Sequence, residues 1–413
     1  MKTEVAIIGA GPAGLMAAVA SAAGAKTTVI EANPSAGRKL LRTGRSRCNL
    51  THAGSIEEFV GAYGPFAGFL SHSLHQFSPS DLQRFLAEHG LQTKVERSGC
   101  IFPVSDRASD VLAVLIKDSE KLAVRFLFGR RVSAVEKSKE GFVLRIHNEQ
   151  VIARSVVIAT GGVTWPQTGS TGDGYEFAKS FGHEVVRPRA ALTTLVTAED
   201  WPSQLQGVGL ENVTITAKVA NRRFRTAGAM MFTENGIGGP AVFDLSRLIT
   251  DFLPAEDTPI KVTVDLLTEY SQQELENKII SLCTKSPKKL LENIVAAFLP
   301  RSLALNIAAR IAPASSISAA HLSKPERRRL IALLKGLELS IKKTGPISNA
   351  TVTRGGICTA QIDRKIMESR ICPGLFFAGE VINVDGPSGG YNLQIAFSTG
   401  YLAGKMAAKS ATG

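Results

Sequence analysis

A glycine-rich turn near the N-terminus constrains this fold more than any other stretch. Four apolar residues, Val5 to Ile8, predict a short buried strand, and an Ala-rich run from Leu15 to Ala23 predicts a helix after the turn. Between them Gly9, Gly11 and Gly14 have the spacing G-x-G-x-x-G. In this arrangement the first glycine permits the tight turn, the second lets a pyrophosphate approach the backbone, and the third lets the helix pack closely on the strand.

A second strand and an acidic residue complete the motif. Thr27 to Ile30 form an apolar run that ends in Glu31, near the offset of about 20 residues expected for a carboxylate that binds a ribose. This order predicts a dinucleotide whose phosphates lie at the helix N-terminus; an ordinary tight turn is the alternative. The carboxylate suits a ribose with free hydroxyls, as in FAD or NAD, and would repel a 2′-phosphate. The expected cofactor contacts here are Gly9, Gly11, Pro12, Ala13, Gly14 and Glu31.

Length and composition set the broad class. The chain has 413 residues, 44% of them hydrophobic, which suffices for two or three domains. No 18-residue apolar run lacks a charge or a breaker, so no membrane span is expected, and the first strand begins too early to leave room for a signal peptide. Five scattered cysteines without a C-x-x-C pair argue against a disulfide framework and a zinc site. We therefore expect a cytoplasmic protein with reduced thiols and no metal.

The net charge of +12 exceeds what one cofactor requires. A generally basic surface accounts for it. The alternative is a polyanionic partner such as RNA.

A basic loop follows Glu31. Five basic residues and no acid occur from Arg38 to Arg47, among glycines and small polar residues that break a helix. The loop is well placed for a pyrophosphate or an anionic substrate, and a solvated run of charges is the alternative. The loop residues expected at the cofactor are Arg38, Lys39, Arg47, Cys48 and Asn49.

Two more strands end in glycine-containing turns, as the N-terminal strand does. A buried strand, Val156 to Ile158, runs into Thr160-Gly161, and a long glycine-rich loop from Thr164 to Tyr175 follows. Near the C-terminus a strand from Gly374 ends at Glu380, and a final helix extends to about Ala408. The chain thus begins and ends in one nucleotide-binding domain. The expected cofactor contacts in these segments are Thr160, Gly161, Gly379, Glu380, Asp385, Gly390, Asn392 and Leu393.

An insertion separates these segments. From about Ala191 strand-like pieces dominate, and residues 269–336 then have a helical pattern. We predict a domain formed by 1–191 and 345–413, a β part formed by 192–268 and 337–344, and a helical part at 269–336. The insertion carries three basic clusters, Arg222–Arg225, Lys285–Lys289 and Arg327–Arg329, for which solvated helix faces are the alternative.

The glycine turns after three strands resemble those of the two-dinucleotide-binding-domain flavoproteins. More closely, nearly the whole chain resembles the BaiN/RdsA-like, or aminoacetone oxidase-like, NAD(P)/FAD-dependent oxidoreductases. The stretches that carry the resemblance are 37–51, 166–175, 231–245 and 349–400. Arg45 and Ser46 stand where the family pattern Gly-Gly-Gly-Arg-Cys-Asn has glycine.

The resemblance implies an α/β, Rossmann-like FAD domain interrupted by a β-barrel and a small helical domain. It places the ADP part of FAD at the N-terminal turn, and the ribityl chain and flavin at the C-terminal strand and helix. Glu380 and Asp385 are then candidates for ribityl contacts, with helix capping as the alternative. We expect the helix near Gly390 to direct its N-terminus at the flavin pyrimidine. Arg45 and Arg47 would favour a thiolate at Cys48. Cys48 is also a candidate proton donor opposite the flavin hydride; a packed turn residue is the alternative.

The reaction stays open among three functions. No second G-x-G-x-x-G follows a strand, so either NAD(P)H docks transiently or the substrate itself reduces the flavin. The first function is reduction of an unsaturated substrate with NAD(P)H as the electron donor. That substrate is either a small molecule or an RNA base, such as uridine in ribosomal RNA. The second is oxidation of a small amine such as aminoacetone with oxygen, and the third is RNA binding with structural FAD. The oligomeric state is not predicted.

Overall fold

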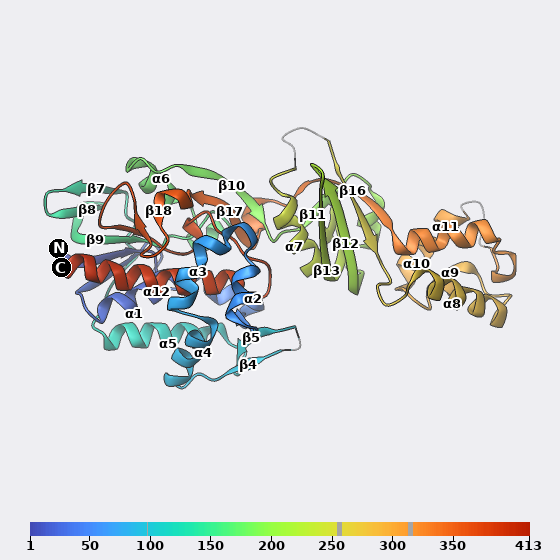
Figure 1. Cartoon of the computed structure of the whole chain (residues 1–413), viewed down its shortest axis with the longest axis horizontal. Helices are drawn as coiled ribbons and strands as arrows, with labels where there is room; N and C mark the ends of the chain where they lie inside the picture. Colours follow the sequence, from blue (N-terminus) through green and yellow to red (C-terminus); the bar gives the residue numbers. More distant parts are fainter. Residues whose placement is uncertain (97, 254–257, 313–316) are drawn as a thin grey trace. The chain divides into compact units, whose positions relative to one another are not determined.

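The chain forms two compact units. The structure is a computed structural model that describes residues 1–96, 98–253, 258–312 and 317–413. One unit combines Met1–Arg189 with Ile347–Gly413, and the other is Ala190–Pro346. The first unit therefore contains both the blue N-terminal and the red C-terminal segments of Figure 1.

A parallel sheet forms the centre of the first unit. Its inner apolar strands are buried on both faces, as parallel strands between helices usually are, whereas the edge strand β6 is partly exposed. In spatial order these strands are β20 (Leu375–Phe377), β9 (Glu149–Ile158), β1 (Lys2–Ile8), β2 (Thr27–Glu31) and β6 (Arg125–Phe128). Antiparallel additions are β18 (Ile362–Asp363) and β19 (Glu368–Ser369) beside β20, and β7 (Ala134–Ser138) and β8 (Gly141–Ile146) beside β9.

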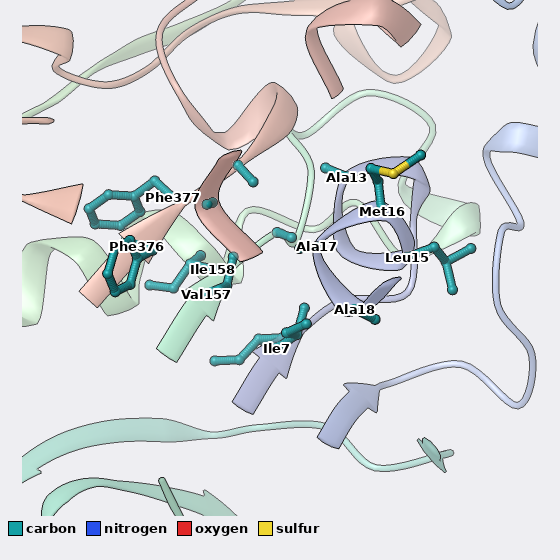
Figure 2. Close-up of a cluster of buried hydrophobic side chains, with 14 of the residues drawn as sticks. Ile7, Ala13, Leu15, Met16, Ala17, Ala18, Val157, Ile158, Phe376 and Phe377 are labelled. Carbon is teal, nitrogen blue, oxygen red and sulfur yellow. The ribbon is translucent and has the colours of Figure 1, made fainter. Parts of the chain in front are cut away.

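Helix α1 (Pro12–Ala22) and the C-terminal helix α12 (Tyr391–Thr412) pack directly on each other. Two glycines of α12 make this possible: a Cβ on Gly400 would lie 2.3 Å from the carbonyl oxygen of Ala13, and one on Gly404 2.2 Å from that of Ala17. Figure 2 shows the apolar side chains of α1, β1, β9 and β20 in one buried cluster. The two ends of the chain are thus held together by close helix packing.

The remaining elements of the first unit surround this sheet. Its other helices are α2 (Ile56–Gly61), α3 (Ala67–Gln76), α4 (Pro79–Glu88), α5 (Ala108–Lys121) and α6 (Asp173–Ser180). Smaller sheets pair β3 (Thr51–His52), β5 (Cys100–Pro103) and β4 (Thr93–Val95), and β10 (Val185–Ala191) with β17 (Val352–Ile357). A serine caps α2 and α4 through the backbone N–H three residues later, which fixes where each helix begins.

The second unit contains a closed six-stranded barrel. Around the barrel the strands are β11 (Leu195–Thr197), β14 (Gly236–Gly238), β13 (Arg222–Thr233), β12 (Gly209–Val219), β15 (Ile260–Asp265) and β16 (Leu337–Thr344). Buried and exposed residues alternate along β15 and β16, so the apolar side chains fill the interior. The helices are α7 (Pro240–Ile249), α8 (Gln272–Lys285), α9 (Leu291–Val295), α10 (Arg301–Ile311) and α11 (Lys324–Lys335).

The predicted fold class is confirmed. A Rossmann-type α/β unit built from both ends of the chain is interrupted by a segment that contains a closed barrel and helices. The finer division of that segment into separate β and helical domains stays a prediction.

Candidate functional site

Three predicted turns lie at one edge of the parallel sheet. Ile8 at the end of β1 is in register with Ile158 at the end of β9, which is in register with Phe377 at the end of β20. The turns that begin at Gly9, Ala159 and Ala378 therefore leave the sheet side by side. The carboxyl edge of such a sheet is where ligands bind in open α/β folds.

Each of the three positions in the first turn is glycine for a different structural reason. Gly9 has φ +104°, and a Cβ on it would lie 2.5 Å from the carbonyl oxygen of Ala159. A Cβ on Gly14 would lie 1.9 Å from the carbonyl oxygen of Gly9. Gly11 has an extended φ of −78° and open space where a Cβ would be. The protein itself requires glycine at positions 9 and 14 but not at 11, as expected if a ligand approaches the backbone there.

Glu31 ends β2 next to this turn. Its carboxylate accepts hydrogen bonds from the backbone N–H of Ala10 at 2.7 Å and of Asn33 at 2.8 Å. The Asn33 amide also donates to Glu31 at 2.7 Å and accepts from the Arg38 guanidinium at 2.7 Å. Arg38 is exposed, so the structure brings Glu31 and Arg38 together at the turn through Asn33.

Lys39 and Glu380 join distant parts of the chain at this edge. The Lys39 ammonium lies 2.7 Å from the Glu380 carboxylate and donates to the Thr164 hydroxyl at 2.7 Å. The other Glu380 oxygen accepts from the backbone N–H of Thr353 at 2.8 Å and from the Thr164 hydroxyl at 3.1 Å. Both predicted cofactor residues thus belong to one polar network, in which sequence reasoning missed Thr353.

The Glu380 carboxylate stays ionised in this network. Burial raises its pKa, but the charge of Lys39 and the hydrogen bonds from Lys39 and Thr353 outweigh burial, so the pKa lies below its ordinary 4.5. One-fifth of its side chain is exposed. Glu380 can therefore accept hydrogen bonds at neutral pH, which is what a ribityl contact requires.

The basic loop has an unusual backbone. Gly44, Arg45, Ser46 and Cys48 all have φ between 55° and 68°. For a residue with a Cβ this left-handed conformation costs about 1–2 kcal/mol. The loop therefore keeps a glycine-type geometry at Arg45 and Ser46 despite their side chains.

Arg47 is engaged within the protein. Its guanidinium forms ion pairs with Glu96 and with Asp106, the latter at 2.7 Å, and lies 4.1 Å from the centre of the Phe102 ring. Lys94 pairs with the same Asp106 carboxylate. Arg47 thus anchors the loop to neighbouring segments, and a direct contact between Arg47 and a cofactor stays a prediction.

The expected thiolate at Cys48 is wrong. The side chain is fully buried. Burial raises the pKa of the Cys48 thiol to about 12, although a hydrogen bond with Thr43 lowers it. The sequence suggested that Arg45 and Arg47 would stabilise a thiolate. Arg45 is exposed, however, and Arg47 forms ion pairs with two carboxylates. Cys48 is a neutral thiol, and its role as a proton donor stays a prediction.

The first turn of α12 lies beside the same loop. The Asn49 amide, oriented with its oxygen toward α12, accepts from the backbone N–H of Gly390 at 3.3 Å. The Asn392 side chain is bonded to the backbone of Gly386, at 2.9 Å both as acceptor and as donor. Because its amide is used in this way, Asn392 and its neighbour Leu393 offer a ligand their backbone N–H groups, which have no partner four residues earlier in the helix.

Asp385 is fully buried beneath this turn. Its carboxylate lies 3.0 Å from the Arg354 guanidinium, which lies 5.7 Å from the centre of the Phe66 ring. The buried charge is thereby compensated, as a buried carboxylate requires. The structure supports an orienting role for Asp385 in the loop that precedes α12.

The turn after β9 contains an unsatisfied hydroxyl. Gly161 has φ +75°, and the neighbouring Thr160 hydroxyl is buried without a hydrogen-bond partner among the described residues. A Cβ on Gly174 would lie 2.2 Å from this hydroxyl. The turn therefore packs closely against the start of α6.

An aromatic cluster beside the turn of α12 was not predicted. The Tyr391 ring stacks on His52 with a centroid distance of 5.1 Å and lies 4.6 Å from Phe59 and 5.8 Å from Tyr63. The Tyr63 hydroxyl donates to the Tyr391 carbonyl oxygen at 3.0 Å. Tyr63 and Tyr391 are 328 positions apart in the chain, and the four residues share no motif, so only the fold could reveal the cluster.

The geometry at the sheet edge is that of the dinucleotide-binding proteins of the Rossmann type. The HI0933-like protein Rossmann domain matches residues 3–406, so the chain belongs to the HI0933-like family, and it is an FAD-dependent oxidoreductase. The resemblance found in the sequence is confirmed.

Two curated relatives span almost the whole chain. A 3-dehydro-bile acid delta(4,6)-reductase from Clostridium scindens is 33% identical over 98% of this chain and 99% of its own length. A ribosomal RNA dihydrouridine synthase from Haemophilus influenzae is 32% identical over 97% of each chain. The fold is also similar to that of a 3-ketosteroid-delta4-(5alpha)-dehydrogenase from Rhodococcus jostii RHA1, with a TM-score of 0.50, 17% identity and coverage of 98% of this chain and 97% of that one.

Two features are absent from the described parts of the chain. No described helix is long and apolar enough to cross a membrane. Within the same residues no group of three or more His, Cys, Asp or Glu side chains is arranged to hold a metal ion.

Proposed function

We propose that this protein uses FAD and NAD(P)H to reduce a carbon–carbon double bond conjugated to a carbonyl group, with uridine in ribosomal RNA as the specific substrate. The support comes from what the two relatives share. A 3-dehydro bile acid with double bonds at positions 4 and 6 is a conjugated ketone, and the C5–C6 double bond of uracil is conjugated to its C4 carbonyl. Both names therefore describe the addition of hydrogen to the same kind of bond.

The residues at the sheet edge fit FAD. The observation that carries this is Gly11, whose missing side chain nothing in the protein explains. We place the pyrophosphate at this turn and at the N-terminus of α1, and the adenosine ribose at Glu31. The ribityl chain is assigned to Glu380, held by Lys39. FAD bound there would supply the hydride chemistry, and the protein would supply position and electrostatics.

The N-terminus of α12 is suited to stabilise negative charge. This helix has 22 residues, and its first backbone N–H groups have no acceptor four residues earlier. Their aligned dipoles favour an anion at this end. We assign the N–H groups of Asn392 and Leu393 to the pole of the cofactor that gains negative charge on reduction. Asn49 contacts this turn through the backbone N–H of Gly390, and Arg354 holds Asp385 in the loop that precedes the helix.

The substrate assignment is tested in the RNA itself. Dihydrouridine is mapped in ribosomal RNA from a strain that lacks the gene, from the parent, and from the strain complemented with wild type or with Gly11→Val. We expect one dihydrouridine to be lost in the deletion strain and restored by the wild-type gene alone. An unchanged dihydrouridine map would contradict the RNA substrate.

A further inference from the structure

We infer that the outer face of the barrel binds the phosphate backbone of RNA through a row of basic side chains on three neighbouring strands. This inference rests on the proposed function, because it names the surface that would hold the RNA. The row consists of Arg223 on β13, Lys218 on β12 and Lys261 on β15. We call it the basic row.

Strand register places these side chains next to one another. Arg223 lies opposite Lys218 in the antiparallel pair of β12 and β13. Ala217 lies opposite Val262 in the pair of β12 and β15, so the next position sets Lys218 level with Lys261. Neighbouring strands are about 4.8 Å apart, so three positive charges stand in a line across the sheet.

Alternation along the strands directs the row outward. Ala217 and Val262 are fully buried in the barrel, whereas Lys218, Arg223 and Lys261 are exposed. Two positions further along the strands, the neighbouring row on the same face consists of Arg225, Thr216 and Thr263. Basic and hydroxyl side chains are the groups that bind nucleic-acid phosphates without reading sequence.

The row is electrostatically unfavourable in the protein alone. Like charges directly opposite on paired strands are destabilising. Across residues 1–96, 98–253, 258–312 and 317–413 none of the three basic side chains forms an ion pair. Two acids lie on the same face: Asp265 pairs with Lys335 at 2.7 Å, and Glu338 on β16 is level with Thr263 rather than with the row. A bound polyanion would relieve the repulsion.

Several members of the other basic clusters of the second unit have partners or favourable positions within the protein. Arg222 points to the other face of β13 and lies 6.0 Å from the centre of the Phe252 ring. Arg327 pairs with Glu276 at 3.3 Å, and Arg329 donates to the carbonyl oxygen of Arg310 at 3.2 Å. Lys285 lies in the last turn of α8, where the helix dipole stabilises a positive charge.

Net charge alone does not single out this surface. Residues 190–346 contain 19 Lys and Arg against 15 Asp and Glu, so they hold only four of the twelve surplus positive charges. The inference therefore rests on the alignment of the three side chains.

The test compares two triple variants of the full-length protein with the same loss of charge. One is Lys218→Gln, Arg223→Gln, Lys261→Gln. The matched control is Lys117→Gln, Lys121→Gln, Lys409→Gln, which removes three exposed lysines from helices of the first unit. Binding of deproteinised total ribosomal RNA is measured by filter retention as a function of salt. NAD(P)H-dependent flavin reduction and thermal unfolding are measured for both variants.

We expect the slope of log affinity against log salt to fall by about 2 to 3 in the basic-row variant, at about 0.7–0.9 per phosphate contact. The control should change the slope by less than one, and both variants should keep wild-type flavin reduction. The basic-row variant should unfold at or above the wild-type temperature, because removing like charges on paired strands relieves their repulsion. Equal slopes in the two variants would overturn the inference, as would displacement of the RNA by polyglutamate of equal charge, which would indicate an acidic protein partner. A lowered slope together with an unchanged dihydrouridine map would retain the surface and reject the proposed reaction.

Discussion

At the scale of single residues, Gly11 carries the cofactor assignment. Gly9 and Gly14 are required by backbone conformation and packing, so a substitution there would test the fold rather than the ligand. Gly11 has an ordinary φ and free space beyond its Cα hydrogen. Its identity is explained by a ligand that approaches the backbone.

We predict that Gly11→Val weakens FAD binding more than tenfold, that is, by more than about 1.4 kcal/mol, because its side chain would occupy the pyrophosphate site. Gly24→Val is the matched control, since a Cβ at Gly24 also meets nothing within 4 Å. FAD titration of both apoproteins by fluorescence quenching provides the measurement. Equal affinities in the two variants would move the pyrophosphate away from this turn.

Glu380 provides a pH-dependent prediction. Its pKa is lowered in the folded protein, so its contribution to stability is complete above the unfolded value near 4.5 and is lost as the pH falls through the lower folded pKa. Glu380→Gln should therefore reduce the free energy of unfolding at pH 7, and its difference from wild type should shrink below about pH 4.5. Urea unfolding between pH 3 and pH 7 measures this.

Glu140 offers the control for this experiment. Its carboxylate lies 2.7 Å from the Lys2 ammonium, the same separation as in the Lys39–Glu380 pair, but both side chains are largely exposed. Exposed ion pairs contribute little to stability. Glu140→Gln should therefore change unfolding much less at every pH, and an equal effect in both variants would show that Glu380 is stabilised no more than a surface carboxylate.

At the scale of elements, the contact between α1 and α12 holds the two ends of the chain in one unit. Gly404→Ala should destabilise the protein. The gain in helix propensity is about 1 kcal/mol, but a Cβ 2.2 Å from the Ala17 carbonyl oxygen forces the helices apart, at a cost of about 1–3 kcal/mol.

The matched substitution is Gly68→Ala in α3, where the nearest neighbour of a new Cβ is the flexible Arg364 guanidinium at 3.9 Å. This variant should be neutral or more stable. Thermal unfolding of the two proteins distinguishes them, and a Gly404→Ala protein as stable as Gly68→Ala would contradict the close packing of α1 and α12.

Elements were predictable where the signal is local. The glycine turn, the short apolar strands and the helices between residues 269 and 336 follow from neighbouring residues, and the structure contains them. Helix α7 lies in the stretch that was predicted to be the β part. Residues 55–100 have a helical pattern, but the structure ends α4 at Glu88 and continues with β4 and β5. Those short strands gain their stability from pairing with each other and with β3, which a local pattern does not reveal.

At the scale of the whole molecule, the site depends on contacts between residues far apart in sequence. Lys39 meets Glu380 across 341 positions, and Arg47 meets Asp106 across 59. The sequence predicted which turns gather at the sheet edge, because parallel strands end on the same side. It could not predict which loop charges neutralise one another, and for that reason it expected a thiolate at Cys48.

In the proposed reaction, electrons pass from NAD(P)H through FAD to a conjugated double bond. The most direct measurement is anaerobic stopped-flow absorbance of the bound flavin, mixed first with NADPH, NADH or aminoacetone and then with ribosomal RNA from the deletion strain or with oxygen. We predict that a nicotinamide donor bleaches the flavin and that the RNA restores its absorbance. Bleaching by aminoacetone with recovery by oxygen alone, or a flavin that no donor reduces, would contradict the proposed reaction.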